Sequence, residues 1–371
     1  MTDPRPLPAG CVRRCPGCAH RHLSLAQSAA RKHDWLAQRL ADWADRLQPV
    51  VAVDEATRWH YRDRVCLKAQ WRGDGWQIGM NLDDEVLAIP DCPVHSARVR
   101  DTLHALLAHL PPGENFPLAY VAQSGAQLTL VLKTRDLPPP DWLAGSLASD
   151  LEAAGVEGLW LHLHPSVGRK IFNKPGWHLL WGEPRSRDAE GLYYGPVGFQ
   201  QLIPALYRRA LDQARDFLAP GPDTQVVDLY SGGGTTLRRW HAAGADCIGV
   251  ELGAQSCECA ALNVPQAVTL RGKCEHRLPQ LNAWMNEKRR KNKIRLLYLN
   301  PPRTGLEAQV REWITAEYKP ARIAYLSCSA GTLYRDLQAL TKVGYRVEAL
   351  SPYDFFPNTW HVETLALLHL W

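Results

Sequence analysis

The chain has 371 residues, enough for two or three domains, so a single small binding module is excluded. Apolar residues make up 46% and charged residues 22%, which excludes a disordered chain or a fibrous repeat. The formal charge of +5 permits a polyanionic partner without requiring one. The chain starts without an apolar signal core and has no run of about 18 apolar residues, so we expect a cytoplasmic protein with no membrane partner. In that reducing compartment its ten cysteines stay unpaired and are available for metal binding or catalysis.

The N-terminal half divides into two predicted segments. Residues 1–48 hold three closely spaced cysteines and then a run of helical apolar spacing over about 23–47, which predicts a cysteine-cluster loop followed by a helix. Residues 49–195 alternate short apolar runs with Gly, Pro and Asn breaks, and helices are expected over 97–109 and 142–154. We therefore predict an α+β central domain.

The C-terminal segment, residues 196–371, changes to a regular alternation of strands and helices. A helix is expected from about 200 to 218, and strands over 224–230, 246–252, 267–272, 294–300 and 322–328. This alternation predicts an α/β, Rossmann-like, doubly wound parallel sheet. Two further strands around a short loop are expected after residue 345.

A glycine-rich turn follows the first of these strands. Asp228 lies near the strand end, Tyr230 follows, and the glycines between Gly232 and Gly234 lead into a helix. Glycines let the backbone approach a ligand, and a helix N-terminus offers free N–H groups. Glu251, after the next strand, could accept two hydrogen bonds from a ribose diol. The pattern indicates a site for S-adenosylmethionine (SAM), and an ordinary turn with surface acids is the alternative.

Candidate reactive residues follow the fourth and fifth strands. Asn300 precedes two prolines that fix its loop, and its amide could pair with N3–H and O4 of uracil; a turn-capping Asn is the alternative. Cys328 lies just before a helix, whose N-terminus is expected to favour the thiolate, although a lone cysteine is more often a small buried apolar residue. The loop over 354–363 carries Glu363 back toward the sheet, so a nucleophile and a base are predicted together.

The motifs DLYSGGGT, NPPR, SCSAGT and DFFPNTWHVE occur in this order and resemble those of the uracil-5 RNA methyltransferases. The resemblance runs from Cys11 to the end of the chain and is strongest to the ribosomal RNA branch that has an iron-sulfur cluster and no TRAM domain. It implies a class I SAM-dependent methyltransferase domain, attack of Cys328 on C6 of uracil, methylation at C5, and removal of the C5 proton by Glu363. The Phe199–Gln200 pair resembles the family's Phe-Gln pair. The implied cofactor-binding residues are Gln200, Asp228, Tyr230, Gly232, Gly234, Glu251 and Asn300.

One departure from the family concerns the adenine pocket. Lys273 stands where the family generally has an acid that meets the adenine amino group, and an ammonium cannot accept that hydrogen bond. Glu275 is the neighbouring carboxylate that could substitute for it. The other reading is reduced cofactor affinity.

Four cysteines are candidate metal ligands. Cys11, Cys15 and Cys18 lie within eight residues, and Cys92 follows with 73 residues between it and Cys18. Four thiolates can hold zinc or a [4Fe-4S] cluster, and ligand count does not distinguish the two. The family resemblance favours [4Fe-4S], with zinc as the alternative.

The partner implied by the resemblance is RNA, with ribosomal RNA favoured over tRNA and no obligate protein partner. Basic residues near the cysteine loop are predicted to neutralise phosphates: Arg13, Arg14, Arg21, Arg31 and Lys32. Two alternatives remain open at this stage. One is a cytosine-5 methyltransferase, and the other is a catalytically weak or inactive RNA-binding assembly factor of the same fold.

Overall fold

The computed structural model describes residues 6–83, 85–143, 145–166, 170–198, 200–288, 290 and 292–371, which form two compact units. The first unit comprises residues 1–22 and 55–197, and the second comprises residues 23–54 and 198–371. No helix in the described ranges is both long enough and apolar enough to cross a bilayer.

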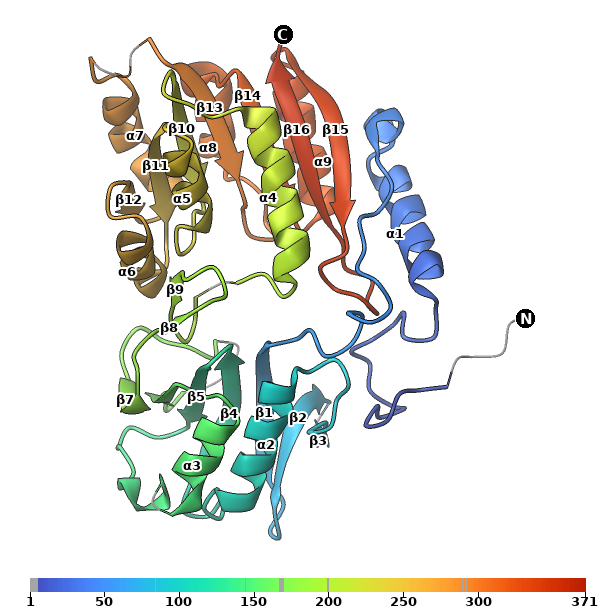
Figure 1. Cartoon of the computed structure of the whole chain (residues 1–371), viewed down its shortest axis with the longest axis vertical. Helices are drawn as coiled ribbons and strands as arrows, with labels where there is room; N and C mark the ends of the chain where they lie inside the picture. Colours follow the sequence, from blue (N-terminus) through green and yellow to red (C-terminus); the bar gives the residue numbers. More distant parts are fainter. Residues whose placement is uncertain are drawn as a thin grey trace. The chain divides into compact units, whose positions relative to one another are not determined.

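The first unit is an α+β fold, as predicted. Its described residues form a seven-stranded sheet in the order β3-β2-β1-β4-β5-β6-β7, in which only β5 and β6 pair in parallel. Helices α2 and α3 bury apolar side chains against this sheet (Figure 1). The principal elements are β1 (Arg64–Trp71), β2 (Trp76–Leu82), β3 (Glu85–Ala88), α2 (Ala97–His109), β4 (Leu118–Ser124), β5 (Gln127–Leu132), η2 (Pro140–Leu143), α3 (Ser146–Ala153), β6 (Gly158–Leu163), β7 (Trp177–Gly182), β8 (Ser186–Arg187) and β9 (Tyr193–Tyr194).

The second unit is the predicted Rossmann-like sheet. In the described part of the chain it has seven strands in the order β12-β11-β10-β13-β14-β16-β15; the first five are parallel and β16 is antiparallel to both neighbours. Its elements are α1 (Leu25–Arg39), η1 (Ala41–Arg46), α4 (Pro204–Leu218), β10 (Thr224–Leu229), α5 (Thr235–Ala242), β11 (Asp246–Glu251), α6 (Ala254–Asn263), β12 (Val268–Arg271), η3 (Cys274–Arg277), α7 (Leu278–Met285), β13 (Ile294–Leu299), α8 (Ala308–Trp313), η4 (Ile314–Tyr318), β14 (Arg322–Ser327), α9 (Ala330–Thr341), β15 (Tyr345–Tyr353) and β16 (Glu363–Leu370).

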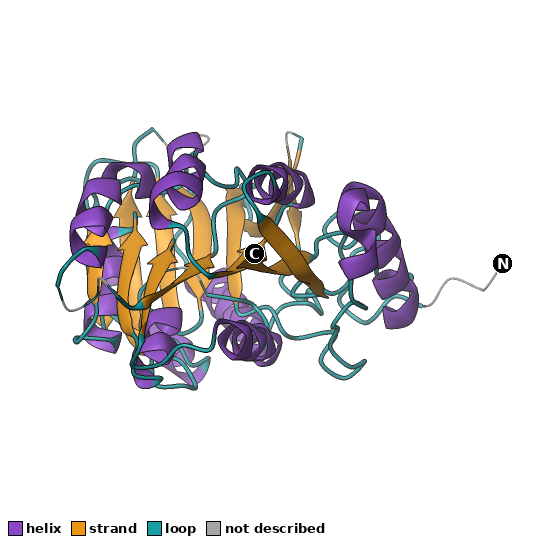
Figure 2. Ribbon diagram, turned by 90° about the horizontal axis from the view of Figure 1, so that it is seen from above, coloured by secondary structure: helices purple, strands orange, loops and turns teal. Residues whose placement is uncertain are grey.

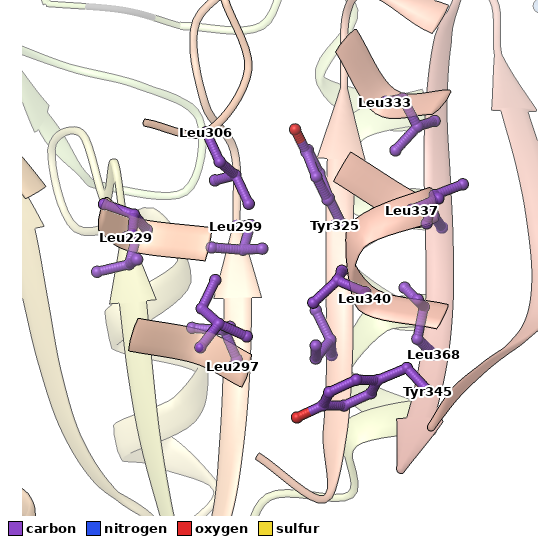
Figure 3. Packing of buried hydrophobic residues seen from close by; sticks show 14 of the residues in the cluster. Leu229, Leu297, Leu299, Leu306, Tyr325, Leu333, Leu337, Leu340, Tyr345 and Leu368 are labelled. Atoms are coloured by element: carbon purple, nitrogen blue, oxygen red, sulfur yellow. The ribbon is translucent and has the colours of Figure 1, made fainter. Parts of the chain in front are cut away.

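Helices cover both faces of this sheet (Figure 2), which explains why the residues of its central strands are almost continuously buried. On one face, Leu229 and Leu299 pack in a core with Leu333 and Leu337 of α9, part of which is drawn in Figure 3. This core also contains side chains of α1, α7 and α8. Because parallel strands end at one edge, this arrangement gathers the residues after β10, β13 and β14.

The N-terminal helix belongs to the second unit. Leu36 and Leu40 are buried in the core under α9, and the following segment pairs with β15 through Leu47 and Val51. The predicted segment 1–48 is therefore split between the two units: its cysteine loop belongs to the first unit and its helix to the second. The helix is also shorter than predicted, because non-helical backbone at Leu40 separates α1 from the 3₁₀ turn η1.

Candidate active site

The glycine-rich turn between β10 and α5 has a left-handed backbone. Tyr230, Gly232 and Gly234 have φ angles of 62°, 57° and 86°. A Cβ atom on Gly234 would lie 3.2 Å from the backbone of Ala260, so this turn packs closely against α6. The left-handed φ of Tyr230 is costly for a residue with a side chain and is typical of a functional turn.

Glu251, at the end of β11, ties this turn in place. Its Oε2 accepts a hydrogen bond from the backbone N–H of Gly232 at 3.0 Å, and its Oε1 accepts one from that of Gly253 at 2.6 Å. Each carboxylate oxygen has a second lone pair. The same carboxylate can therefore hold the turn and still accept hydrogen bonds from a diol.

Asp228 is fully buried beneath α5. Its Oδ2 accepts a hydrogen bond from Nε1 of Trp240 at 2.9 Å, while Oδ1 has no hydrogen-bond partner among the described residues. Burial raises the pKa of Asp228 to about 7. The hydrogen bond to Trp240 holds helix α5, which begins at the glycine turn. It therefore favours a role for Asp228 in supporting that turn.

The Phe199–Gln200 pair lies partly outside the described residues, which omit Phe199. Gln200 is half-buried, whereas its neighbour Gln201 is buried and its Nε2 donates a hydrogen bond to Oε2 of Glu363 at 2.9 Å. Sequence reasoning missed Gln201. The double Gln was the available signal, but only the fold decides which of the two side chains faces Glu363.

The predicted nucleophile and base come together at the ends of β14 and β16. Ser327 pairs with Thr364 in the antiparallel register, so Cys328 and Glu363 lie at the same edge. The two side chains are close enough to interact electrostatically, because the Glu363 carboxylate acts to raise the pKa of Cys328. The guanidinium of Arg303 acts to lower the pKa of both groups. Asn300 follows β13 at this edge, and its N–H approaches the carbonyl of Leu229 at 3.4 Å.

Burial dominates the electrostatics of this site. Glu363 is 4% exposed, and burial raises its pKa to about 7 against the lowering effects of Gln201 and Arg303. The pKa of the Cys328 thiol is also raised, chiefly by burial and then by Glu363. The expected gain in thiolate character is therefore wrong for the site without substrate, because desolvation outweighs the favourable groups around the thiol.

The loop after Asn300 is clamped by helix α9. The buried carboxylate of Asp336 accepts hydrogen bonds from Leu306 N at 3.0 Å and from Tyr325 Oη at 2.8 Å. Arg335 bonds both to Asp336 and to the carbonyl oxygen of Thr304. Since α9 starts two residues after Cys328, one helix fixes the surroundings of both Cys328 and the Asn300 loop.

Tyr230, in the glycine turn, is linked to the segment that follows the Asn300 loop. The hydroxyl of Tyr230 donates a hydrogen bond to the carboxylate of Glu307, the residue directly before α8. Lys273 and Glu275 form an ion pair with an N–O distance of 3.2 Å after β12. Both features lie at the carboxyl edge of the sheet, where open α/β folds bind their ligands.

In the first unit, the four predicted ligand cysteines line one small cavity of about 20 Å³. Burial, followed by the neighbouring thiols Cys92, Cys15 and Cys11, raises the pKa of Cys18 to about 12. Across the described residues, however, no group of three or more His, Cys, Asp or Glu side chains has an arrangement that could hold a metal ion. The four cysteines therefore line one cavity, but their thiols are not arranged to bind one metal ion.

Two basic residues near the cysteine loop have structural partners. Arg21 donates hydrogen bonds to the carbonyl oxygens of Cys15 and Arg13, which closes the loop. The prediction that Lys32 contacts phosphate is wrong, because its side chain is 0% exposed and lies 2.6 Å from Asp354 in the second unit. Helical spacing in the sequence could not reveal a partner 322 residues away.

The strand order, the glycine turn and the residues at the strand ends define a Rossmann-like SAM-dependent methyltransferase fold. In the family comparison, residues 284–370 match the model described as tRNA (uracil-5-)-methyltransferase. The chain is 28% identical to a 23S rRNA (uracil(1939)-C(5))-methyltransferase RlmD of a Shewanella species, over 96% of this chain and 80% of the relative. A similar match, also 28% identical, covers 82% of an uncharacterized RNA methyltransferase of Thermosynechococcus vestitus.

A solved structure shares the whole architecture. The tRNA (uracil-54, C5)-methyltransferase of Pyrococcus abyssi, in complex with S-adenosyl-L-homocysteine, has a TM-score of 0.73 and 21% sequence identity. The similarity covers 95% of this chain and 86% of that one. The chain is therefore similar to RNA uracil-5 methyltransferases over nearly its whole length, and its C-terminal residues 284–370 match the model of that family.

Proposed function

We propose that this enzyme transfers the methyl group of SAM to C5 of a uridine in structured RNA through a covalent adduct of Cys328. The observation that carries the proposal is the meeting of Cys328 and the buried Glu363 at neighbouring strand ends, with Arg303 acting on both. A nucleophile beside a base is the arrangement that addition and elimination on a uracil ring need.

The proposed chemistry begins with the thiolate of Cys328, which adds to C6 of uracil. The C5=C6 electron pair moves toward C5 and O4, where the Asn300 amide holds N3–H and O4 by hydrogen bonds. The nucleophilic C5 carbon would take the methyl group of bound SAM, and the broken S–CH3 bond would leave S-adenosyl-L-homocysteine. Glu363 then removes the C5 proton, the C5=C6 bond re-forms, and the Cys328 thiolate leaves. Burial raises the pKa of Cys328, and the guanidinium of Arg303 opposes this shift and so favours the thiolate.

The proposed SAM site lies around the glycine turn and uses Gln200, Asp228, Tyr230, Gly232, Gly234, Glu251 and Asn300. It is supported by the left-handed turn and by the position of Glu251 beside it. The Glu251 carboxylate would bind the ribose hydroxyls. Glu275, paired with Lys273, is the carboxylate available to the adenine amino group.

We further propose that Cys11, Cys15, Cys18 and Cys92 hold a [4Fe-4S] cluster, as in the iron-sulfur branch that the sequence resembles. The four thiols line one cavity, which supports a shared site for them, and the resemblance favours the cluster over zinc. The proposed substrate is ribosomal RNA, in accord with the ribosomal RNA specificity named for the Shewanella relative. The proposed location is the cytoplasm, and no obligate protein partner is required.

The proposed function is tested by incubating the protein with labelled SAM and with undermodified 23S rRNA or tRNA, followed by nucleoside analysis. We expect label in 5-methyluridine of the ribosomal RNA and none with the Cys328→Ala variant. Label in 5-methylcytosine would support the cytosine-5 alternative. Absence of transfer to either RNA would favour the inactive RNA-binding factor.

A further inference from the structure

A fully buried ion pair joins α1 to the loop that leads into Glu363. Nζ of Lys32 lies 2.6 Å from Oδ1 of Asp354, and the two side chains are 0% and 1% exposed. Lys32 is on α1, and Asp354 is the residue directly after β15, in the same compact unit (Figure 1). Desolvation makes a buried ion pair a weak source of stability, so its presence calls for another explanation.

The pair holds a short chain of hydrogen bonds. Nζ of Lys32 also donates to the carbonyl oxygen of Phe356 at 3.3 Å, while Asp354 Oδ1 accepts from the N–H of Phe356 at 3.3 Å. The Phe356 carbonyl accepts from Oγ1 of Thr359 at 2.8 Å, and Oγ1 of Thr359 accepts from the N–H of His361 at 3.1 Å. This chain ends two residues before Glu363.

The other end of the loop is fixed independently. The N–H of Asp354 donates to the carbonyl oxygen of Val51 at 2.9 Å, and Val51 forms a bridge with Tyr353. Beyond the loop, Glu363 is the first residue of β16 and pairs with Tyr353 across the hairpin. Both ends of the loop are thus tied to neighbouring segments, and between them the Lys32 ammonium binds the carbonyl oxygen of Phe356 directly.

We propose that Lys32 is a positioning residue for the Glu363 base. This inference rests on the proposed function, since it assigns Lys32 to the step in which Glu363 removes the C5 proton. Lys32 acts through the Asp354–His361 loop and keeps the Glu363 carboxylate directed at that proton. Its removal affects release of the covalent RNA adduct and leaves adduct formation by Cys328 intact.

The test uses Lys32→Met, which keeps the length of the side chain and removes the ammonium. Arg39→Met is the matched control, because Arg39 is an exposed basic residue on the same helix. With uridine RNA and SAM, adduct formation and adduct release are followed separately by denaturing gel after rapid quenching. We expect release to slow by about tenfold or more in Lys32→Met, since small misplacements of reacting groups have effects of this size. Adduct formation, and both rates in Arg39→Met, stay at the wild-type values.

The inference would be overturned if folded Lys32→Met protein released the adduct at the wild-type rate. It would also be overturned if the rates of adduct formation and adduct release fell equally. If Lys32→Met does not fold, the double variant Lys32→Met/Asp354→Leu decides, because replacing both buried charges by apolar groups preserves packing. Slow release in the folded double variant supports the inference, and wild-type release contradicts it. Failure of the proposed function is distinguishable, because the wild-type protein would then form no adduct.

Discussion

At the scale of single residues, burial sets the pKa of Glu363, the proposed base. Its carboxylate is 4% exposed, and burial raises its pKa to about 7, above the ordinary Glu value, although Gln201 and Arg303 oppose the shift. A base with a pKa near the working pH can both accept and release a proton. Below pH 7 the carboxyl group is mostly protonated and cannot remove the C5 proton.

The rate of adduct release should therefore rise with pH through about 7 and level off above it. In Glu363→Gln we expect release to slow by about 100-fold or more, the contribution typical of a general base, and its rise near pH 7 to disappear. Quenched-flow measurement of the covalent complex between pH 5.5 and 9 checks both points.

The matched control is Glu348→Gln, an exposed carboxylate on the neighbouring strand β15 that faces His369. Its pH profile should equal that of the wild-type protein. An unchanged release rate in Glu363→Gln would remove this residue from the assigned role.

Single contacts of this kind also mark the limit of sequence-based prediction. Cys328 and Glu363 could be paired in advance because each follows a recognisable motif at a strand end. Gln201 and Lys32 could not, because their partners lie 162 and 322 residues away and depend on the tertiary fold. The expected thiolate character of Cys328 failed for a related reason, since the extent of burial is a property of the folded site.

At the scale of elements, helix α9 connects Cys328, the proposed nucleophile, to the Asn300 loop. Gly305, with a φ of 70°, lies against this helix, and a Cβ atom there would be 2.6 Å from Nη2 of Arg335 and 2.8 Å from Oδ2 of Asp336. Those two side chains bind the loop that contains Arg303. The glycine is therefore needed both for its backbone conformation and for the close approach of the helix.

We expect Gly305→Ala to lower the stability of the protein by about 1–3 kcal/mol and to reduce methyl transfer, because the loop must shift away from α9. Gly221→Ala is the control, since no atom lies within 4 Å of a Cβ at that position. Thermal unfolding and single-turnover methylation measure the two effects. Equal stability and activity in the two variants would contradict the proposed clamp.

The elements themselves were largely predictable. All five parallel strands of the second unit were expected near their observed positions, because strands covered on both faces read as apolar runs. Helix ends were less predictable. Helix α4 begins at Pro204 rather than near residue 200, since proline is favoured at the first turn and Ile203 before it has non-helical backbone angles.

At the scale of the whole molecule, chain order and structural units do not coincide. The cysteine loop belongs to the first unit, while the following helix α1 is packed in the core of the second. Amphipathic spacing predicts that α1 has a buried face but not which core receives it. The cysteine loop instead meets Cys92, which follows strand β3 of the first unit.

If this loop holds a [4Fe-4S] cluster, anaerobically purified protein should contain about four iron and four sulfide per chain. Cys92→Ser should lose the iron and the visible absorption of the cluster, because it removes one of the four thiols around the cavity. Cys66→Ser, a change in strand β1 of the same sheet and outside that cavity, is the control and should retain both. One zinc per chain without iron would contradict the cluster proposal.

The covalent adduct is the most direct test of the account as a whole. The protein is incubated with SAM and RNA containing 5-fluorouridine, whose C5 fluorine cannot be removed as a proton, and the products are separated under denaturing conditions. A stable protein–RNA complex is predicted for the wild-type chain, with the link mapped to Cys328 by mass spectrometry and absent in Cys328→Ala. A methylated RNA product formed by Cys328→Ala, or an adduct at another cysteine, would contradict the account.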